Sequence, residues 1–154
     1  MTHTNAKPFL TVISWTYKRP TLLKKQQDSL AMQTCQEFNQ IVTVDDRGIG
    51  IPAVHAALQK TDCETPYIWI FDDDDIITDP TFIEKVKAVA DKERPDVIFC
   101  KSQHTPVLVH PDTWPIEFAH ISNINYIVSQ EVWLRYRMCY TAESGGMATS
   151  SSPC

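Results

Sequence analysis

Short apolar runs alternate with helical patterns between residues 9 and 100. The apolar runs are rich in β-branched and aromatic residues, which predicts strands at residues 9–14, 38–44, 67–71 and 95–100. The segments between them favour helices at residues 21–33, at residues 53–60 and after Pro80. This alternation predicts an α/β fold with a mostly parallel sheet and helices on both of its faces.

The helix after Pro80 has the clearest signature. Asp79 offers a capping oxygen, and Pro80 suits the first turn because its missing N–H does no harm there. Apolar residues follow at the spacing of one helix face: Phe82, Ile83, Val86, Val89 and Ala90. The sequence therefore predicts a helix that starts at Asp79-Pro80.

The last third of the chain is less regular. Prolines at positions 106, 111 and 115 predict an irregular path from about His104. Residues 121–138 then predict a strand and a helix, with the helix starting near Ser129. On this side of the domain, we expect an exposed apolar surface around Ile124, Tyr126 and Trp133.

Composition narrows the possible functions. The chain has 154 residues, 43% of them hydrophobic, and a formal net charge of -5, which is typical of one ordinary globular domain. Its densest basic group contains only Lys18, Arg19, Lys24 and Lys25, so a general nucleic-acid binder is not expected.

Five cysteines without a C-x-x-C pair predict neither a disulfide framework nor a zinc knuckle. No apolar run has the length of a signal peptide or a membrane span, so we expect a cytoplasmic protein without a transmembrane segment.

Polar residues gather where three of the predicted strands end. Residues 16–19 follow the first strand, Asp45 and Asp46 end the second, and four consecutive aspartates, residues 72–75, end the third. Ligands of parallel sheets bind beyond the carboxyl ends of the strands, so these groups are expected to meet at one edge. A solvated turn would explain one acidic cluster. A divalent cation is the alternative, because Mg²⁺ and Mn²⁺ favour carboxylate oxygens.

At this point the residues resemble a known family, the inverting family 2 glycosyltransferases of the GT-A fold. Residues 11–20, TVISWTYKRP, are similar to the family's opening strand and T-Y-N-R-P loop, and residues 29–34, SLAMQT, to its S-L-x-x-Q-T helix end. Residues 41–46, IVTVDD, resemble its V-V-D-D strand, and residues 67–75, YIWIFDDDD, its Y-I-x-F-L-D-x-D-D strand. The four pieces follow the family's order over residues 9–100.

The resemblance implies a donor site for a nucleoside diphosphate sugar, with a UDP-sugar favoured. Thr16 and Tyr17 would lie against the base, and Asp46 would accept a hydrogen bond from a base N–H. Tyr17 could instead be a core residue with its hydroxyl at the rim. Arg19 could contact the phosphates or be a solvated surface arginine.

The aspartates receive their roles from the same resemblance. Asp72 and Asp74 match the family's D-x-D motif, with Asp72 toward the ribose and both as ligands of Mg²⁺ or Mn²⁺. The resemblance also implies that Asp73 is one of the donor-binding residues. In an extended segment, Asp72 and Asp74 would share one face, while Asp73 and Asp75 would point the other way.

The resemblance also suggests a domain division and shows where the chain departs from the family. Residues 1–140 would form one domain, with a nucleotide-sugar-binding half at 9–100, a partial acceptor-side half at 101–140 and a disordered tail at 141–154. Trp15 replaces a proline or small residue and is expected to narrow the base pocket or stack on it. Residues 144–151, SGGMATSS, stand where the family has its acidic general base, and Glu143 is not assigned that role. We therefore expect a C-terminus that is truncated or frameshifted, and the catalytic residue is unknown.

Three functions remain open. The first is transfer of a sugar from a nucleoside diphosphate sugar to the hydroxyl of an unknown acceptor, such as a glycan. The second is a non-catalytic nucleotide- or metal-binding remnant of such an enzyme. The third, a sugar-phosphate nucleotidyltransferase, ranks low because the loop after the first strand lacks glycine.

Overall fold

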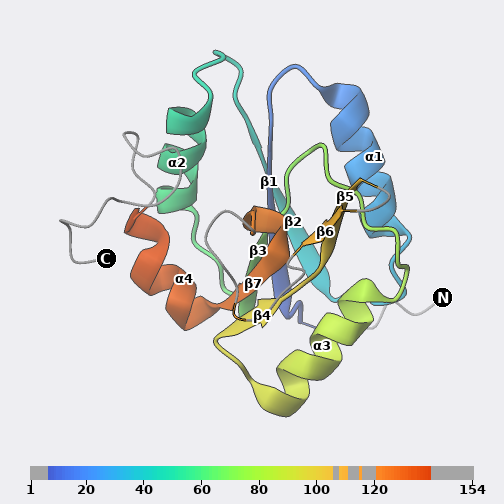
Figure 1. Cartoon of the computed structure of the whole chain (residues 1–154). Coiled ribbons are helices and arrows are strands. Elements are labelled where there is room, and N and C mark those ends of the chain that lie inside the picture. The colour runs from blue at the N-terminus through green and yellow to red at the C-terminus, as the bar shows by residue number, and fades with distance from the viewer. Residues whose placement is uncertain (1–6, 106–107, 111–114, 116–120, 140–154) are drawn as a thin grey trace.

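A five-stranded sheet runs through the centre of the molecule (Figure 1). The structure is a computed structural model that describes residues 7–105, 108–110, 115 and 121–139. The strands lie in the order β2-β1-β3-β7-β4. Their bounds are β1 Leu10–Thr16, β2 Phe38–Val44, β3 Tyr67–Ile70, β4 Val97–Phe99 and β7 Tyr126–Ser129.

Four of the five strands run in the same direction, as the alternation of strands and helices predicted, and β7 runs against them. β1 pairs in parallel with both β2 and β3. β7 lies between β3 and β4 and is antiparallel to each of them. All five strands fall close to predicted positions, and the prediction of an α/β fold is confirmed.

Helices cover both faces of the sheet, in two pairs (Figure 1). On one face, α1 (Pro20–Ala31) and α3 (Phe82–Glu93) enclose a core that includes Val12, Trp69 and Phe71. On the other face, α2 (Ile51–Lys60) and α4 (Gln130–Tyr136) enclose a second core that includes Ile13 and Ile70. Neighbouring strand residues alternate between the two cores because successive side chains of a strand point to opposite faces.

The start of α3 differs from the sequence prediction by two residues. The helix begins at Phe82, with Thr81 as its N-cap residue. The Asp79 carboxylate still accepts the Thr81 backbone N–H at 2.9 Å and the Thr81 hydroxyl at 2.8 Å. Asp79 therefore stabilises the turn before the helix and does not cap the helix itself.

Two further predictions for the last third of the chain are corrected. Residues after His104 are not wholly irregular, because β5 (Ser102–Thr105) and β6 (Leu108–His110) form a two-stranded antiparallel sheet. Trp133 is not exposed: only 3% of it is accessible, because it packs in the core under α2 and α4. The prediction of a helix starting near Ser129 is confirmed, since the Ser129 hydroxyl accepts the Val132 backbone N–H.

Short 3₁₀ turns flank this last part of the fold, at Asn123–Asn125 and Arg137–Cys139. None of the helices in the described ranges is both long enough and apolar enough to cross a membrane. Cys35, Cys63 and Cys100 are free thiols. The predicted tail at residues 141–154 lies outside the described residues.

Candidate functional site

The carboxyl ends of β1, β2 and β3 form one edge of the sheet. In the parallel register Thr16 lies opposite Val44, and Ile13 lies opposite Ile70. The segments that follow these strands therefore leave the sheet side by side. This strand register confirms the prediction that the three polar groups lie at one edge of the sheet.

The four aspartates form a turn and not an extended segment. β3 ends at Ile70, and the Asp75 backbone N–H donates to the Asp72 carbonyl at 3.1 Å, which closes a turn. The alternation of strand side chains consequently does not apply, so the prediction that Asp72 and Asp74 share a face by that rule is wrong. Their surroundings differ residue by residue: Asp72 and Asp75 are half-buried, Asp73 is buried and Asp74 is exposed.

Arg19 joins the loop after β1 to this turn. Its Nη2 lies 2.6 Å from Asp73 Oδ1, and its Nη1 donates to Asp74 Oδ2 at 3.2 Å. The Asp73 side chain is fully buried, and within the described part of the chain neither of its oxygens accepts a well-aligned hydrogen bond. The short contact with Asp73 is thus an ion pair without hydrogen-bond geometry. Arg19 is therefore held by two aspartates, and 35% of its side chain remains exposed.

One guanidinium does not neutralise the whole turn. The pKa of Asp72 is raised, chiefly because burial disfavours the charged carboxylate and also because Asp74 and Asp73 lie near. Burial and the neighbouring carboxylates raise the pKa of Asp75 to about 6. Both shifts arise mainly from burial and in part from the neighbouring negative charge, and a bound cation would favour the charged carboxylates.

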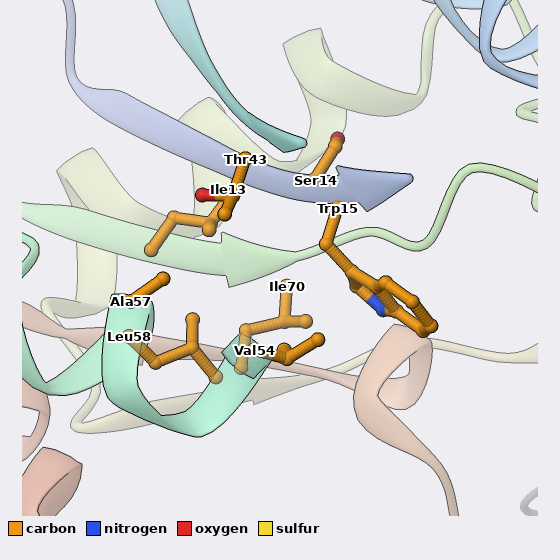
Figure 2. Close-up of a pocket in the computed structure, with 8 residues that line it drawn as sticks. All are labelled: Ile13, Ser14, Trp15, Thr43, Val54, Ala57, Leu58 and Ile70. Carbon is orange, nitrogen blue, oxygen red and sulfur yellow. The ribbon is translucent and has the colours of Figure 1, made fainter. Parts of the chain in front are cut away.

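Trp15 connects the acidic turn to the α2 side of the sheet. Its Nε1 donates to Asp72 Oδ1 at 2.9 Å, and its ring lies 5.6 Å from the Arg19 guanidinium carbon. Figure 2 shows Trp15 and Ile13 on the side of the sheet that faces α2, while Ser14 points the other way. The cavity that the labelled residues line has a volume of about 10 Å³, which is room for no more than one water. It is therefore a packing defect and not a ligand site.

The two aspartates after β2 have different surroundings. Asp45 is buried, and its carboxylate accepts the backbone N–H groups of Gly50 at 2.6 Å and Ile49 at 3.1 Å. The Gly50 hydrogen bond is the main reason why the pKa of Asp45 is lowered. Asp46 is exposed, and no residue in the described part of the chain bonds to its carboxylate. Asp45 therefore shapes the loop, and Asp46 is left available to a ligand.

Tyr17 lies across the same loop. Gly48 has a φ of +69°, and a Cβ built there would come within 2.6 Å of the Tyr17 hydroxyl oxygen, so glycine allows the ring to approach the backbone. Lys18 Nζ lies 5.0 Å from the centre of the Tyr17 ring. Tyr17 is half-buried, which fits both a contact with a base and a core residue with its hydroxyl at the rim. Thr16 is buried, and its hydroxyl has no partner among the described residues.

A pocket of about 110 Å³ opens beside Asp46. Trp15 forms part of its wall. The other lining residues come from β2, the following loop and α2: Thr43, Val44, Asp45, Asp46, Arg47, Ile49, Ala53 and Val54. The mixture of apolar side chains and carboxylates suits a flat ring that carries a hydrogen-bond donor.

The acidic turn offers oxygen ligands without forming a complete metal cage. Within the described ranges, no group of three or more His, Cys, Asp or Glu side chains is arranged to hold a metal ion. Mg²⁺ does not require one, since it is commonly held by one or two carboxylates together with substrate phosphates and water. The exposed Asp74 and half-buried Asp72 fit that mode of binding.

Sequence reasoning missed a second group of polar residues behind the turn. Gln26, Ser29 and Gln33 are buried in and just after α1, and they bond to the backbone that carries the aspartates. In the sequence, Ser29 and Gln33 stand out only through the resemblance of residues 29–34 to the family's helix end. Their spacing of three and four residues along one helix face was the available signal.

Comparisons with known proteins agree with this fold. A crystal structure of residues 1–349 of S. aureus TarS in complex with UDP matches with a TM-score of 0.66 and 17% identity, over 87% of this chain and 52% of that one. The complex of the same TarS residues with UDP-GlcNAc matches with a TM-score of 0.59 and 16% identity, over 78% and 45%. This chain therefore spans about half the length of those TarS chains. No curated protein sequence gives a significant match. The model of the family described as "Glycosyl transferase family 2" matches residues 47–147, which is more than half of the sequence, and the chain therefore belongs to glycosyl transferase family 2.

Proposed function

We propose that this chain binds a nucleoside diphosphate sugar, preferably a UDP-sugar, and contributes to transfer of the sugar to an acceptor hydroxyl. One observation carries the proposal: in a family 2 fold, the pocket beside Asp46 and the acidic turn lie at the same carboxyl edge of the sheet. The two similar TarS structures hold UDP and UDP-GlcNAc, which supports this class of donor.

In this proposal the base lies over the loop after β2. The half-buried Tyr17 ring offers it an apolar face, and the exposed Asp46 carboxylate accepts a hydrogen bond from its N–H. Thr16 is expected near the base, although its buried side chain limits direct contact. Trp15 restricts the pocket on the α2 side.

The diphosphate would lie over the acidic turn. Asp72 and Asp74 would hold Mg²⁺ or Mn²⁺, and Asp73 contributes indirectly by holding Arg19. When bound, the cation would neutralise charge on the departing diphosphate as a Lewis acid. A cation at Asp74 would compete with Arg19, and the guanidinium could then turn toward a phosphate.

The proposal is tested by thermal unfolding with UDP, GDP or CMP, each with and without Mn²⁺. A nucleotide at about 100 times its dissociation constant adds roughly 2.7 kcal/mol to the free energy of unfolding. We expect UDP with Mn²⁺ to stabilise the chain most. Asp74→Ala should abolish the dependence on Mn²⁺, whereas the control Asp91→Ala, an exposed ion-paired aspartate on α3, should retain it. Failure of every nucleotide to stabilise the protein would contradict the proposal.

A non-catalytic remnant is the second candidate. The general base is unassigned, since Glu143 and residues 144–151 lie outside the described residues. A turnover measurement with a UDP-sugar distinguishes an active enzyme from a non-catalytic remnant. Release of UDP from a UDP-sugar supports an enzyme, and tight UDP binding without release supports the remnant.

A further inference from the structure

Helix α1 and the residues after it bury three polar side chains behind the acidic turn. Gln26, Ser29 and Gln33 are 0%, 6% and 4% exposed and lie on one face of the helical path. Burying an amide or hydroxyl without a hydrogen bond is costly, and apolar residues normally occupy such positions. The polar side chains must therefore be matched by specific partners.

Gln26 supports the start of the acidic turn. Its Nε2 donates to the Phe71 carbonyl at 2.8 Å and lies 3.3 Å from the Asp72 carbonyl. The same amide donates to Ser14 Oγ at 2.6 Å, and Gln40 Nε2 donates to Gln26 Oε1 at 2.8 Å. These two contacts on β1 and β2 fix the orientation of the Gln26 amide.

Ser29 and Gln33 support the middle and the end of the same segment. Ser29 Oγ accepts the Ile77 backbone N–H at 3.2 Å and donates to the Gln26 carbonyl at 2.7 Å. Gln33 Nε2 donates to the Asp79 carbonyl at 3.0 Å, and Gln33 Oε1 accepts the Ile83 backbone N–H at 3.1 Å.

The three side chains thus contact the acidic loop, which we define as residues 71–81, at its beginning, middle and end, and Gln33 also contacts Ile83 in the first turn of α3. Between β3 and α3 this loop forms no helix or strand, so its backbone groups need partners from elsewhere. Every contact to the loop is with its main chain. Such contacts fix the path of the loop without using its carboxylates.

We propose that Gln26, Ser29 and Gln33 are positioning residues that hold the acidic loop in its ligand-binding shape. The consequence for ligand binding rests on the proposed function, because it assumes that Asp72–Asp75 receive a nucleoside diphosphate. A purely structural role would lower global stability without selectively loosening this loop. A positioning role also changes the local opening of the loop and the affinity for its ligand.

The experiment compares Ser29→Ala and Gln33→Leu with the control Gln36→Leu. Gln36 is an exposed glutamine near the same helix end, and among the described residues its amide donates only to the carbonyls of Leu30, Ala31 and Gln33, with the shortest bond, 2.7 Å, to Gln33. Two properties are measured: amide hydrogen exchange in peptides covering residues 72–83, and UDP affinity in the presence of Mn²⁺. Two positioning variants are used so that the test survives if one fails to fold.

We expect loop exchange in Ser29→Ala and Gln33→Leu to rise by about five- to tenfold, which matches loss of one net hydrogen bond. UDP affinity should fall by a similar factor, while exchange in β1 stays unchanged. Gln36→Leu should leave the loop and the affinity as in the wild type. Unchanged loop exchange overturns the proposal, and so does faster exchange with unchanged affinity. If the wild type does not bind UDP, the proposed function fails, and loop exchange alone decides the positioning role.

Discussion

Arg19 Nη2 lies 2.6 Å from Asp73 Oδ1, and the Asp73 side chain is fully buried. Along the chain, the two residues are separated by α1, β2, α2 and β3. This ion pair therefore ties the loop after β1 to the acidic loop after β3. It also offsets part of the negative charge of the four adjacent aspartates.

Removing the guanidinium should leave a buried carboxylate without its counter-charge. We expect Arg19→Met to lower the free energy of unfolding by about 3 kcal/mol, because breaking one side of a buried pair is costly. Asp73→Asn should cost less, and the double variant should cost less than the sum of both. Urea unfolding of the wild type, the two single variants and the double variant measures this coupling.

The control Arg135→Met removes an exposed pair with Glu131 and should lower the free energy of unfolding by less than about 1 kcal/mol. Additive effects of the Arg19 and Asp73 substitutions would show that the pair carries no coupling energy.

Tyr17 and Gly48 give a prediction with an internal control. Gly48 and Gly50 both have positive φ, at +69° and +77°, but only a Cβ at position 48 would collide with the Tyr17 ring. Gly48→Ala and Gly50→Ala should each carry a backbone cost of about 1–3 kcal/mol, because both place a side chain at a positive φ. Gly48→Ala should in addition displace Tyr17 and weaken UDP binding. Calorimetric titration with UDP checks this, and equal affinities in the two variants would argue against a role of Tyr17 in base binding.

Much of this arrangement could be predicted from the sequence. Residues 38–44 form the predicted strand without change, and the alternation of strands with helices predicted the parallel neighbours β1, β2 and β3. These features depend on local pattern and on the general behaviour of parallel sheets. The gathering of polar residues at the carboxyl edge follows from the same two properties.

Other features depend on contacts that local pattern does not encode. The direction of β7 between β3 and β4 is set by pairing across the sheet, since a four-residue strand has the same pattern in either direction. The acidic residues form a turn because Arg19, Trp15 and Gln26 hold them from distant parts of the chain. Period-two alternation could not reveal this, since it applies only within a strand.

Trp15 should affect the acidic turn through one hydrogen bond. Trp15→Phe keeps an aromatic ring but removes the Nε1 donor to Asp72, so we expect a loss of about 1 kcal/mol in stability. We also expect weaker binding of UDP with Mn²⁺, because Asp72 loses the contact that orients it. Trp69→Phe is the control, since it removes a similar indole bond, to the Ile124 carbonyl, in the opposite core. If both variants bind UDP equally well, Trp15 does not orient Asp72 for the ligand.

Asp79 provides a pH-dependent prediction at the far end of the acidic loop. Its pKa is lowered to about 2, first by the Lys85 hydrogen bond and then by the Thr81 backbone N–H and hydroxyl. Because the folded pKa lies below the unfolded value of 3.8, the stabilisation is present above pH 3.8 and is lost as the pH falls toward 2. Asp79→Asn should lower the urea midpoint at pH 7, and the difference in urea midpoint between this variant and the wild type should shrink between pH 4 and pH 2.

The control Asp62→Asn changes an exposed aspartate that pairs with Arg137 and lies away from this loop. A difference for Asp79→Asn that stays constant from pH 7 to pH 2 would mean that the charge of Asp79 does not stabilise the turn before α3.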